Sequence, residues 1–292
     1  MYFLQQLVTG LSIGLVYGGL SLAIALVYKG GGAINVAQGE LATTSALLAS
    51  SCIAAGLSWP LTLLISLVGS FVVGTLVFHL LIRPVLASGP VTVLVVTVAL
   101  SLLIDAVNGS VWGFLPRTIT SPFGSGAVHL GSVVITDQQL GMAGLIFLML
   151  ACAGAFFRFT LVGLKMRAAT TNAASARLLG LHVTGLLGLG WGLAALFGAA
   201  VGVSSAPLLG LDPTVFLNVL MFAFAGAVLG GMDSLAGSAL GGVIVGVVAT
   251  LLGAYVPAFG SQLNVVPPFV VMLGVLLIRP SGLFGRGVVG RV

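Results

Sequence analysis

The chain has 292 residues, of which 59% are hydrophobic and only 5% are charged, and its formal net charge is +5. Because a soluble domain carries about 25% charged residues, this composition excludes an ordinary soluble protein and predicts an all-α integral membrane protein. The 10 basic residues are scattered or lie between apolar runs, which favours a role in membrane orientation over nucleic acid binding.

Nine apolar runs follow one another along the chain, and a helix needs about 20 apolar residues to cross the hydrocarbon layer. The runs cover residues 4–28, 38–57, 60–82, 90–113, 138–157, 183–206, 214–231, 235–256 and 264–278. We therefore predict one domain over residues 1–292, a polytopic bundle of about eight or nine transmembrane helices. Gly, Ser and Thr dilute the second, seventh and eighth runs, where broken or re-entrant helices would fit a transport pathway.

Glycines recur at four-residue spacing inside several runs, as at Gly10, Gly14 and Gly18 and again at Gly242 and Gly246. Small residues at this spacing let membrane helices approach closely, so we expect a compact bundle. The first 28 residues contain no Lys or Arg and stay apolar beyond the length of a signal-peptide core, which predicts a retained first span.

Basic residues set the expected orientation. Arg158, Lys165, Arg167 and Arg177 gather in one polar stretch, at about residues 158–182, and further arginines crowd the C-terminal end. Positive charge favours the cytoplasmic side, so we predict a cytoplasmic C-terminus and an N-terminus outside. Counting the spans back from these basic clusters places the segment from Phe114 to Asp137 outside the cell. We expect it to be the main external loop, with an irregular surface structure.

Polar side chains inside the runs cost roughly 3 kcal/mol each at mid-membrane unless they are paired or hydrated. The candidates for a pathway or gating role are Asn35, Gln38, Glu40, Asp105, Asn108 and Asn218. For the first three, a structural network at the helix start is the favoured interpretation, and a pathway or gating role is the alternative. For Asp105 and Asn108, which would share one helix face, helix–helix hydrogen bonding is open as well.

Two further acidic residues predict turns. Asp212 precedes Pro213 and indicates an outer turn, whereas Asp233 lies in a short turn and is expected to cap the following helix.

Other chemistry finds little support in the sequence. Neither Lys29 nor Lys165 follows a glycine, so the chain has no phosphate-binding loop of the Walker A kind. The three histidines lie far apart, which argues against a metal site or a catalytic triad. Cys52 and Cys152 lie inside apolar runs, where small buried residues are expected rather than a disulfide. We predict no enzymatic activity and no cofactor.

The stretch FRFTLVGLKMRAATTNAASARLLGLHV, residues 157–183, interrupts the runs with a basic, alanine-rich, helix-forming segment. It is either an ordinary loop helix that orients the protein or a docking helix whose small residues fit a partner's cleft. The candidate contact residues are Arg167, Ala168, Ala169, Asn172, Ala174, Ala176 and Gly180, and Gly180 is expected to end the helix.

Four stretches together resemble permease subunits of branched-chain amino acid ABC importers. RAATTNAASARLLG (167–180) is similar to the family's cytoplasmic coupling motif, INVAQGE (34–40) to its early signature and LLIRPSGLFG (276–285) to its C-terminal ending. AVLGGMDSLAGSALGGVIVG (227–246) is similar to the glycine-rich segments before that ending. The matches follow the family order over essentially the whole chain.

The resemblance implies a permease in the bacterial cytoplasmic membrane that works with a second, same or related permease chain. It also implies two cytoplasmic ATP-binding subunits, which use the ATP, and an external solute-binding protein. The family commonly has His where Gln38 stands and an aromatic continuation where LATTSALLASS follows. The resemblance therefore implies the type of transporter more firmly than the solute that it carries. The alternative is a secondary transporter or channel that works without ATP.

Overall fold

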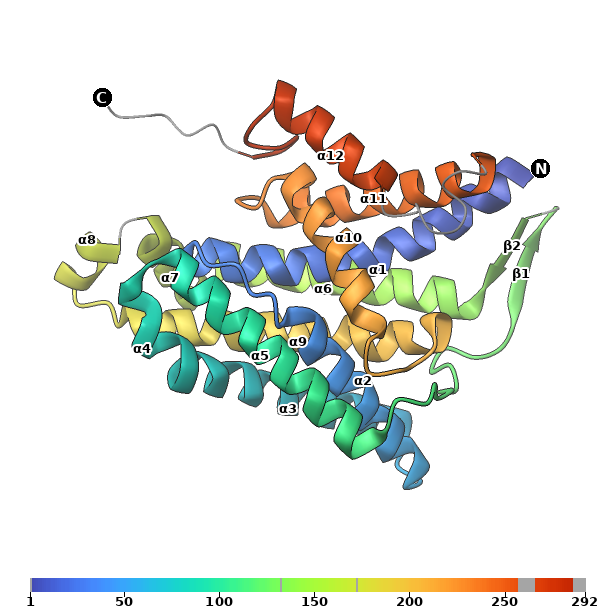
Figure 1. The fold of residues 1–292 in the computed structure, drawn as a ribbon, viewed down its shortest axis with the longest axis horizontal. Helices are drawn as coiled ribbons and strands as arrows, with labels where there is room; N and C mark the ends of the chain where they lie inside the picture. The colour runs from blue at the N-terminus through green and yellow to red at the C-terminus, as the bar shows by residue number, and fades with distance from the viewer. Residues whose placement is uncertain (1, 132, 172, 257–265, 286–292) are drawn as a thin grey trace. The chain divides into compact units, whose positions relative to one another are not determined.

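The computed structural model describes residues 2–131, 133–171, 173–256 and 266–285, and it is built almost wholly of helices (Figure 1). The helices are α1 (Tyr2–Gly31), α2 (Gln38–Ala54), α3 (Trp59–Val77), α4 (Arg83–Val85), α5 (Pro90–Trp112), α6 (Asp137–Phe159), α7 (Leu161–Thr171), α8 (Ala173–Leu178), α9 (Val183–Leu209), α10 (Val215–Gly230), α11 (Leu235–Tyr255) and α12 (Val266–Ile278). A π-helical turn (Phe78–Ile82) follows α3, a short 3-10 turn (Leu86–Ser88) precedes α5, and strands β1 (Ala127–Leu130) and β2 (Val133–Thr136) form a hairpin.

Every predicted apolar run forms a helix, which confirms the polytopic all-α prediction. Within the described residues, 6 helices are long and apolar enough to cross a membrane: α1, α3 with its extension, α5, α6, α9 and α11. The second and seventh runs form the shorter helices α2, of 17 residues, and α10, of 16. The eighth run is not broken, since α11 is continuous over 21 residues.

The chain divides into two compact units, each assembled from separated segments. Unit 1 combines Met1–Ala25, Ser121–Gly144 and Asn218–Val292, and unit 2 combines Leu26–Thr120 and Leu145–Leu217. Because the segments of the two units alternate along the chain, neither unit is a continuous piece of sequence. The single domain over residues 1–292 stays a prediction.

In unit 1, α1, α10 and α11 approach one another backbone to backbone. A Cβ atom placed on Gly242 of α11 would lie 2.5 Å from the Cα of Gly18 on α1, and one on Gly226 of α10 would lie 2.6 Å from the nitrogen of Gly242. Only hydrogen fits at these positions. The glycines therefore do not interrupt α11; they allow its neighbours to reach its backbone.

Two contacts between α1 and α10 complete this packing in unit 1. The Ser21 hydroxyl lies 2.7 Å from the carbonyl oxygen of Ala223. One turn earlier, the Tyr17 ring stacks on Phe222 at a centroid distance of 4.9 Å. The close approach of the two helices is thus secured by a hydrogen bond and by an aromatic pair.

In unit 2, α2, α3 and α9 form the core in the same way. A Cβ atom on Gly74 of α3 would lie 2.8 Å from the Trp191 carbonyl oxygen on α9, and one on Gly202 of α9 would lie 2.5 Å from the Ala42 carbonyl oxygen on α2. These contacts hold α9, most of which is buried, between its two neighbours. By contrast, most of α5 and α6 is exposed, as expected for lipid-facing helices.

The segment from Phe114 to Asp137 is not wholly irregular, contrary to the sequence-based expectation. Its β1 and β2 pair antiparallel from Ala127↔Thr136 to Leu130↔Val133. The β-branched run of β2 favours this structure, and Gly131 in the connection has a φ of +66°. Gln5 of α1 bonds to both backbone groups of Val134, at 3.2 and 2.9 Å, and so holds the hairpin.

Substituting Gly242→Leu tests the backbone packing of unit 1. We expect a loss of about 1–3 kcal/mol or more, because the side chain has no room between α1 and α10. The loss of stability is measured as the change in melting temperature of the detergent-purified protein, with size-exclusion fluorescence as the readout. Gly274→Leu is the matched control, because a Cβ atom there meets nothing within 4 Å. Equal melting temperatures for the two variants would contradict the packing account.

Candidate functional site

An irregular segment, residues 32–37, separates α1 from α2 and is largely buried. Ala33, Asn35 and Ala37 are at most 3% exposed, so the backbone groups of this segment need partners inside the protein. The Asn35 Oδ1 atom accepts a hydrogen bond from the Ala37 amide at 3.1 Å. Thr97 of α5 lies within 3.3 Å of both the Val36 amide and the Ile34 carbonyl oxygen. Side chains thus replace the helical hydrogen bonds.

Gln38 connects this segment to α9. Its Nε2 donates to the Ala194 carbonyl oxygen at 2.9 Å, and its Oε1 accepts from Asn35 Nδ2 at 3.2 Å. Gln38 is fully buried, so removing its amide would leave buried polar groups without partners. Asn35 and Gln38 therefore form a hydrogen-bonded network at the start of α2.

Glu40 and Asp105, by contrast, each have a buried carboxyl oxygen without a hydrogen-bond partner among the described residues. Glu40 is 3% exposed, and its Oε2 accepts no hydrogen bond from any described residue. The buried Oδ1 of Asp105 on α5 is likewise without a partner among those residues. The two carboxyl groups interact electrostatically, and α2 packs against α5. Two neighbouring carboxyl groups with buried oxygens are costly unless a proton, a cation or a donor group lies between or beside them.

Asn108, one turn beyond Asp105, adds a third incompletely bonded group. It is 1% exposed, its Oδ1 lies 3.0 Å from the Thr44 hydroxyl, and its Nδ2 has no partner in the described part of the chain. The Thr44 hydroxyl has a single proton to donate, and the Glu40 carbonyl oxygen, 2.8 Å away, is a second acceptor for it. With the amide of Asn108 turned over, its Nδ2 would donate to Thr44 and its oxygen would be the free atom. The cluster would then offer only oxygen acceptors.

Sequence reasoning missed a polar stripe on α3. Thr62, Ser66 and Ser70 are buried at four-residue spacing, and Ser70 shares a 2.6 Å hydrogen bond with Ser45 of α2. The hydroxyls of Thr62 and Ser66 have no partner among the described residues. The four-residue spacing of these polar residues within an apolar run is the sequence feature that could have revealed the stripe.

The remaining polar candidates lie elsewhere. Asn218 is exposed and belongs to unit 1, whereas the α2–α5 cluster belongs to unit 2. The Asp212 turn is confirmed, since its Oδ1 accepts from the Thr214 amide at 2.8 Å. The capping role expected for Asp233 is wrong: Ser234 caps α11 and accepts from the Gly237 amide at 3.1 Å. No group of three potential metal ligands occurs in the described residues.

The alanine-rich segment is helical wherever the structure describes it. α7 is described to Thr171 and α8 from Ala173. Asn172 lies outside the described residues, and the side chain of Ala174 is not described. Gly180 ends α8 as predicted, with a φ of +76°. Its amide bonds to Arg177 and the next amide to Ala176, a Schellman motif.

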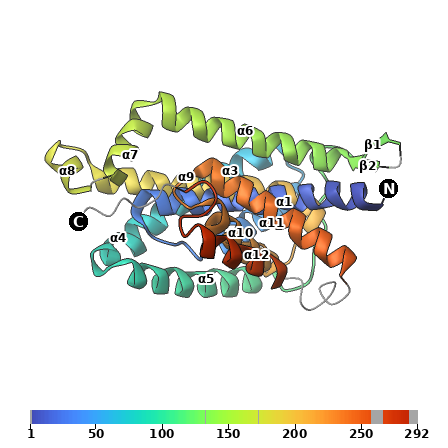
Figure 2. The same cartoon turned by 90° about the horizontal axis from the view of Figure 1, so that it is seen from above.

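The two helices expose a different surface from the one expected. Ala169 and Ala176 are only 4% and 3% exposed, because α7 and α8 pack on α9. Neither alanine can belong to an exposed docking surface. Arg167 and Ala168 are exposed, and the largest apolar exposures are those of Leu178, at 90%, and Leu179, at 79%. Figure 2 shows α7 and α8 beyond the C-terminal end of α6.

Comparisons with known proteins agree over the whole chain. The model of the family "Branched-chain amino acid transport system / permease component" matches residues 6–278. The chain is 28% identical to the high-affinity branched-chain amino acid transport system permease protein LivH of Escherichia coli, and 30% identical to BraD, the protein of the same description from Pseudomonas aeruginosa. Each alignment covers 100% of this chain and 98% of the relative.

Among solved structures, PsaBC from Streptococcus pneumoniae in complex with Fab contains a chain with a TM-score of 0.49. Its sequence identity is 14%, over 95% of this chain and 91% of that one, a likeness too low to transfer function.

Thr97→Val tests how the buried irregular segment is held. The substitution keeps the side-chain shape but leaves the Val36 amide unpaired, so we expect a loss of about 1–3 kcal/mol and faster amide hydrogen exchange at residues 33–37. Thr92→Val on the same helix is the control, because the Thr92 hydroxyl bonds to Ser88 and not to this segment. Unchanged exchange in Thr97→Val would show that the segment is held by other contacts.

Proposed function

This chain belongs to the family of permease components of branched-chain amino acid transport systems and is a membrane-embedded permease subunit; we propose that it moves branched-chain or similar small amino acids inward as part of an ATP-driven importer. In this assembly it pairs with a second permease chain, the same or a related one. An external solute-binding protein delivers the cargo, and two cytoplasmic subunits bind and hydrolyse ATP. The chain itself makes and breaks no bond and needs no cofactor.

The proposed orientation places the N-terminus outside the cell and the C-terminus in the cytoplasm of a bacterium. Its support is the basic cluster that runs from the last turn of α6 to α8, from Arg158 to Arg177, since such clusters remain on the cytoplasmic side. The β1–β2 hairpin then lies outside, where the solute-binding protein docks, and α7 and α8 lie inside.

One observation carries the proposal: two exposed leucines at the C-terminal end of α8. Leu178 is 90% and Leu179 79% exposed, although they adjoin the charged, exposed Arg177. An apolar surface beside basic residues at the cytoplasmic boundary suits contact with another protein. We therefore assign α8 and the exposed residues of α7, including Arg167 and Ala168, to contact with the ATP-binding subunits.

The same unit provides a mechanical route from α7 to the polar cluster. The methyl group of Met166 on α7 lies against Gly190 of α9. One turn further along α9, the Ala194 carbonyl oxygen accepts the hydrogen bond from Gln38. A shift of α7 caused by closure of the ATP-binding subunits would therefore be passed through α9 to the start of α2, as a rigid-body motion of packed helices.

Glu40, Asp105 and Asn108 are the proposed polar part of the pathway in this chain. Their buried acceptors match an ammonium group, which amino acid cargo carries at neutral pH. Asp105 is half-buried on a helix whose Leu102 and Leu103 are 67% and 60% exposed. A carboxyl group on that helix avoids hydrocarbon if its edge faces the pathway or a second permease chain.

Copurification tests the contact with the ATP-binding subunits. We expect Leu178→Asp combined with Leu179→Asp to abolish recovery of these subunits with the tagged permease, since two charges replace the apolar contact. Uptake into ATP-loaded proteoliposomes should fall with it. Leu115→Asp is the control, because Leu115 is 81% exposed in the external loop. Retained association in the double variant, or transport by this chain alone without ATP, would contradict the proposal and favour a secondary transporter or channel.

Neutralising the carboxyl groups tests the pathway. For Glu40→Gln and Asp105→Asn we expect the assembly to be recovered intact. The KM for uptake should rise about 10- to 100-fold, the value of a lost charge-assisted hydrogen bond. Asp233→Asn, in an exposed turn, should leave uptake unchanged. Wild-type KM values in both pathway variants would restrict the two carboxyl groups to a structural role.

A further inference from the structure

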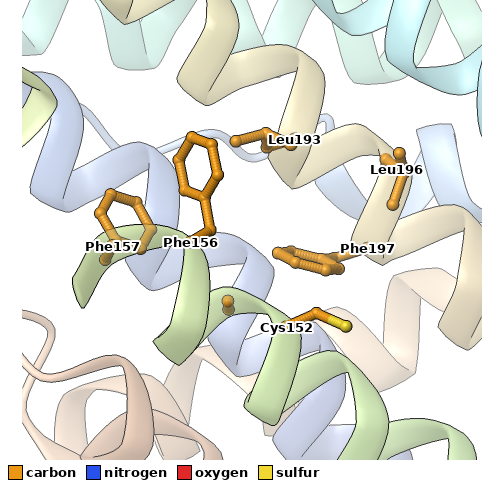
Figure 3. Close-up of a pocket in the computed structure, with 7 residues that line it drawn as sticks. Cys152, Phe156, Phe157, Leu193, Leu196 and Phe197 are labelled. Carbon is orange, nitrogen blue, oxygen red and sulfur yellow. The ribbon is translucent and has the colours of Figure 1, made fainter. Parts of the chain in front are cut away.

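An apolar crevice lies between the second half of α6 and the middle of α9, both in unit 2. It has a volume of about 280 Å³ and is lined only by Cys152, Ala153, Phe156, Phe157, Leu193, Leu196 and Phe197. Figure 3 shows Phe156 of α6 and Phe197 of α9 directed into the same space, with Cys152 beside Phe197. The crevice is not enclosed, since Cys152 in its lining is exposed.

The lining excludes a zwitterionic cargo, because no polar side chain replaces the water that its charged groups would lose. A hydrocarbon chain has no such requirement. In a membrane, an open apolar crevice between two spans is filled by lipid or by another protein.

Charge at one end of the crevice distinguishes between these occupants. The Nζ atom of Lys29 lies 5.9 Å from the centroid of the Phe157 ring, which lines the crevice. Arg158, the next residue along α6, is exposed. The guanidinium of Arg158 lies 5.6 Å from the centroid of the Phe159 ring, which does not line the crevice, so Lys29 is the basic group placed against the lining. A basic group at one end of an apolar crevice matches the phosphate and the acyl chain of an anionic lipid.

We propose that the α6–α9 crevice binds an anionic phospholipid, with one acyl chain among Phe156, Leu196 and Phe197 and the phosphate at Lys29. The leaflet follows from the proposed orientation and is the cytoplasmic one; the binding itself does not depend on the transport function.

Such a lipid would also support the turn that leads into α7. The Thr160 hydroxyl lies 2.6 Å from the Phe156 carbonyl oxygen and accepts from the Gly163 amide at 2.9 Å. Gly163 packs directly against the backbone of Phe157. An acyl chain packed on the two phenylalanines would therefore stabilise the end of α6 from which α7 begins.

The native cysteines provide the test. Cys152 is exposed and lines the crevice, whereas Cys52 is buried and serves as the internal reference. In neutral detergent, phosphatidylglycerol should slow maleimide labelling of Cys152 about fivefold more than phosphatidylcholine with the same acyl chains, the effect of one basic group. Lys29→Gln should remove this difference, and Arg117→Gln, in the external loop, should keep it.

A second variant keeps the test informative if Lys29→Gln does not fold. Leu196→Trp should fill the crevice and slow labelling of Cys152 without added lipid. Equal protection by both lipids in the wild type would overturn the proposal. So would protection that requires a second permease chain, because the crevice would then be a protein interface.

Discussion

The hydrocarbon layer offers no hydrogen-bond partner, so each polar group at that depth must be satisfied inside the protein. Helices meet this requirement along most of the chain. Residues 32–37 cannot, because they are irregular and largely buried, and Asn35, Gln38 and Thr97 supply the missing partners. Among the described residues, Glu40 and Asp105 contribute the carboxyl oxygens that lack such a partner. These oxygens are the groups on which the proposed amino acid pathway rests.

Close packing of glycines is the second consequence of the same solvent. Lipid gives helices no hydrophobic reason to associate, so contact depends on van der Waals fit and on short polar contacts. Both units use glycine against backbone, at Gly242 with Gly18 and at Gly202 with Ala42. In unit 2, α9 contacts both α7, through Met166 and Gly190, and Gln38, through the Ala194 carbonyl oxygen.

Sequence reasoning predicted the helices well, because span length and hydrophobicity follow directly from bilayer thickness. It also placed Gly180 at a helix end. It could not predict that Glu40 and Asp105 lie together, since their pairing depends on how α2 packs against α5 and not on spacing along either helix. For the same reason it counted Ala169 and Ala176 as surface, although both are buried. The hairpin was missed because glycines and prolines dominate the loop around its short β-branched strands.

The central claim is that Asp105 faces the transport pathway and not lipid. Thiol labelling in the assembled importer tests it most directly, with a single cysteine at position 105 or at 103 in a background lacking Cys52 and Cys152. A membrane-impermeant maleimide should react at position 105 and change its rate when ATP-bound and nucleotide-free states are compared, whereas position 103 should stay unreactive. If position 105 were as unreactive as position 103 in every nucleotide state, the carboxyl cluster would not line the pathway.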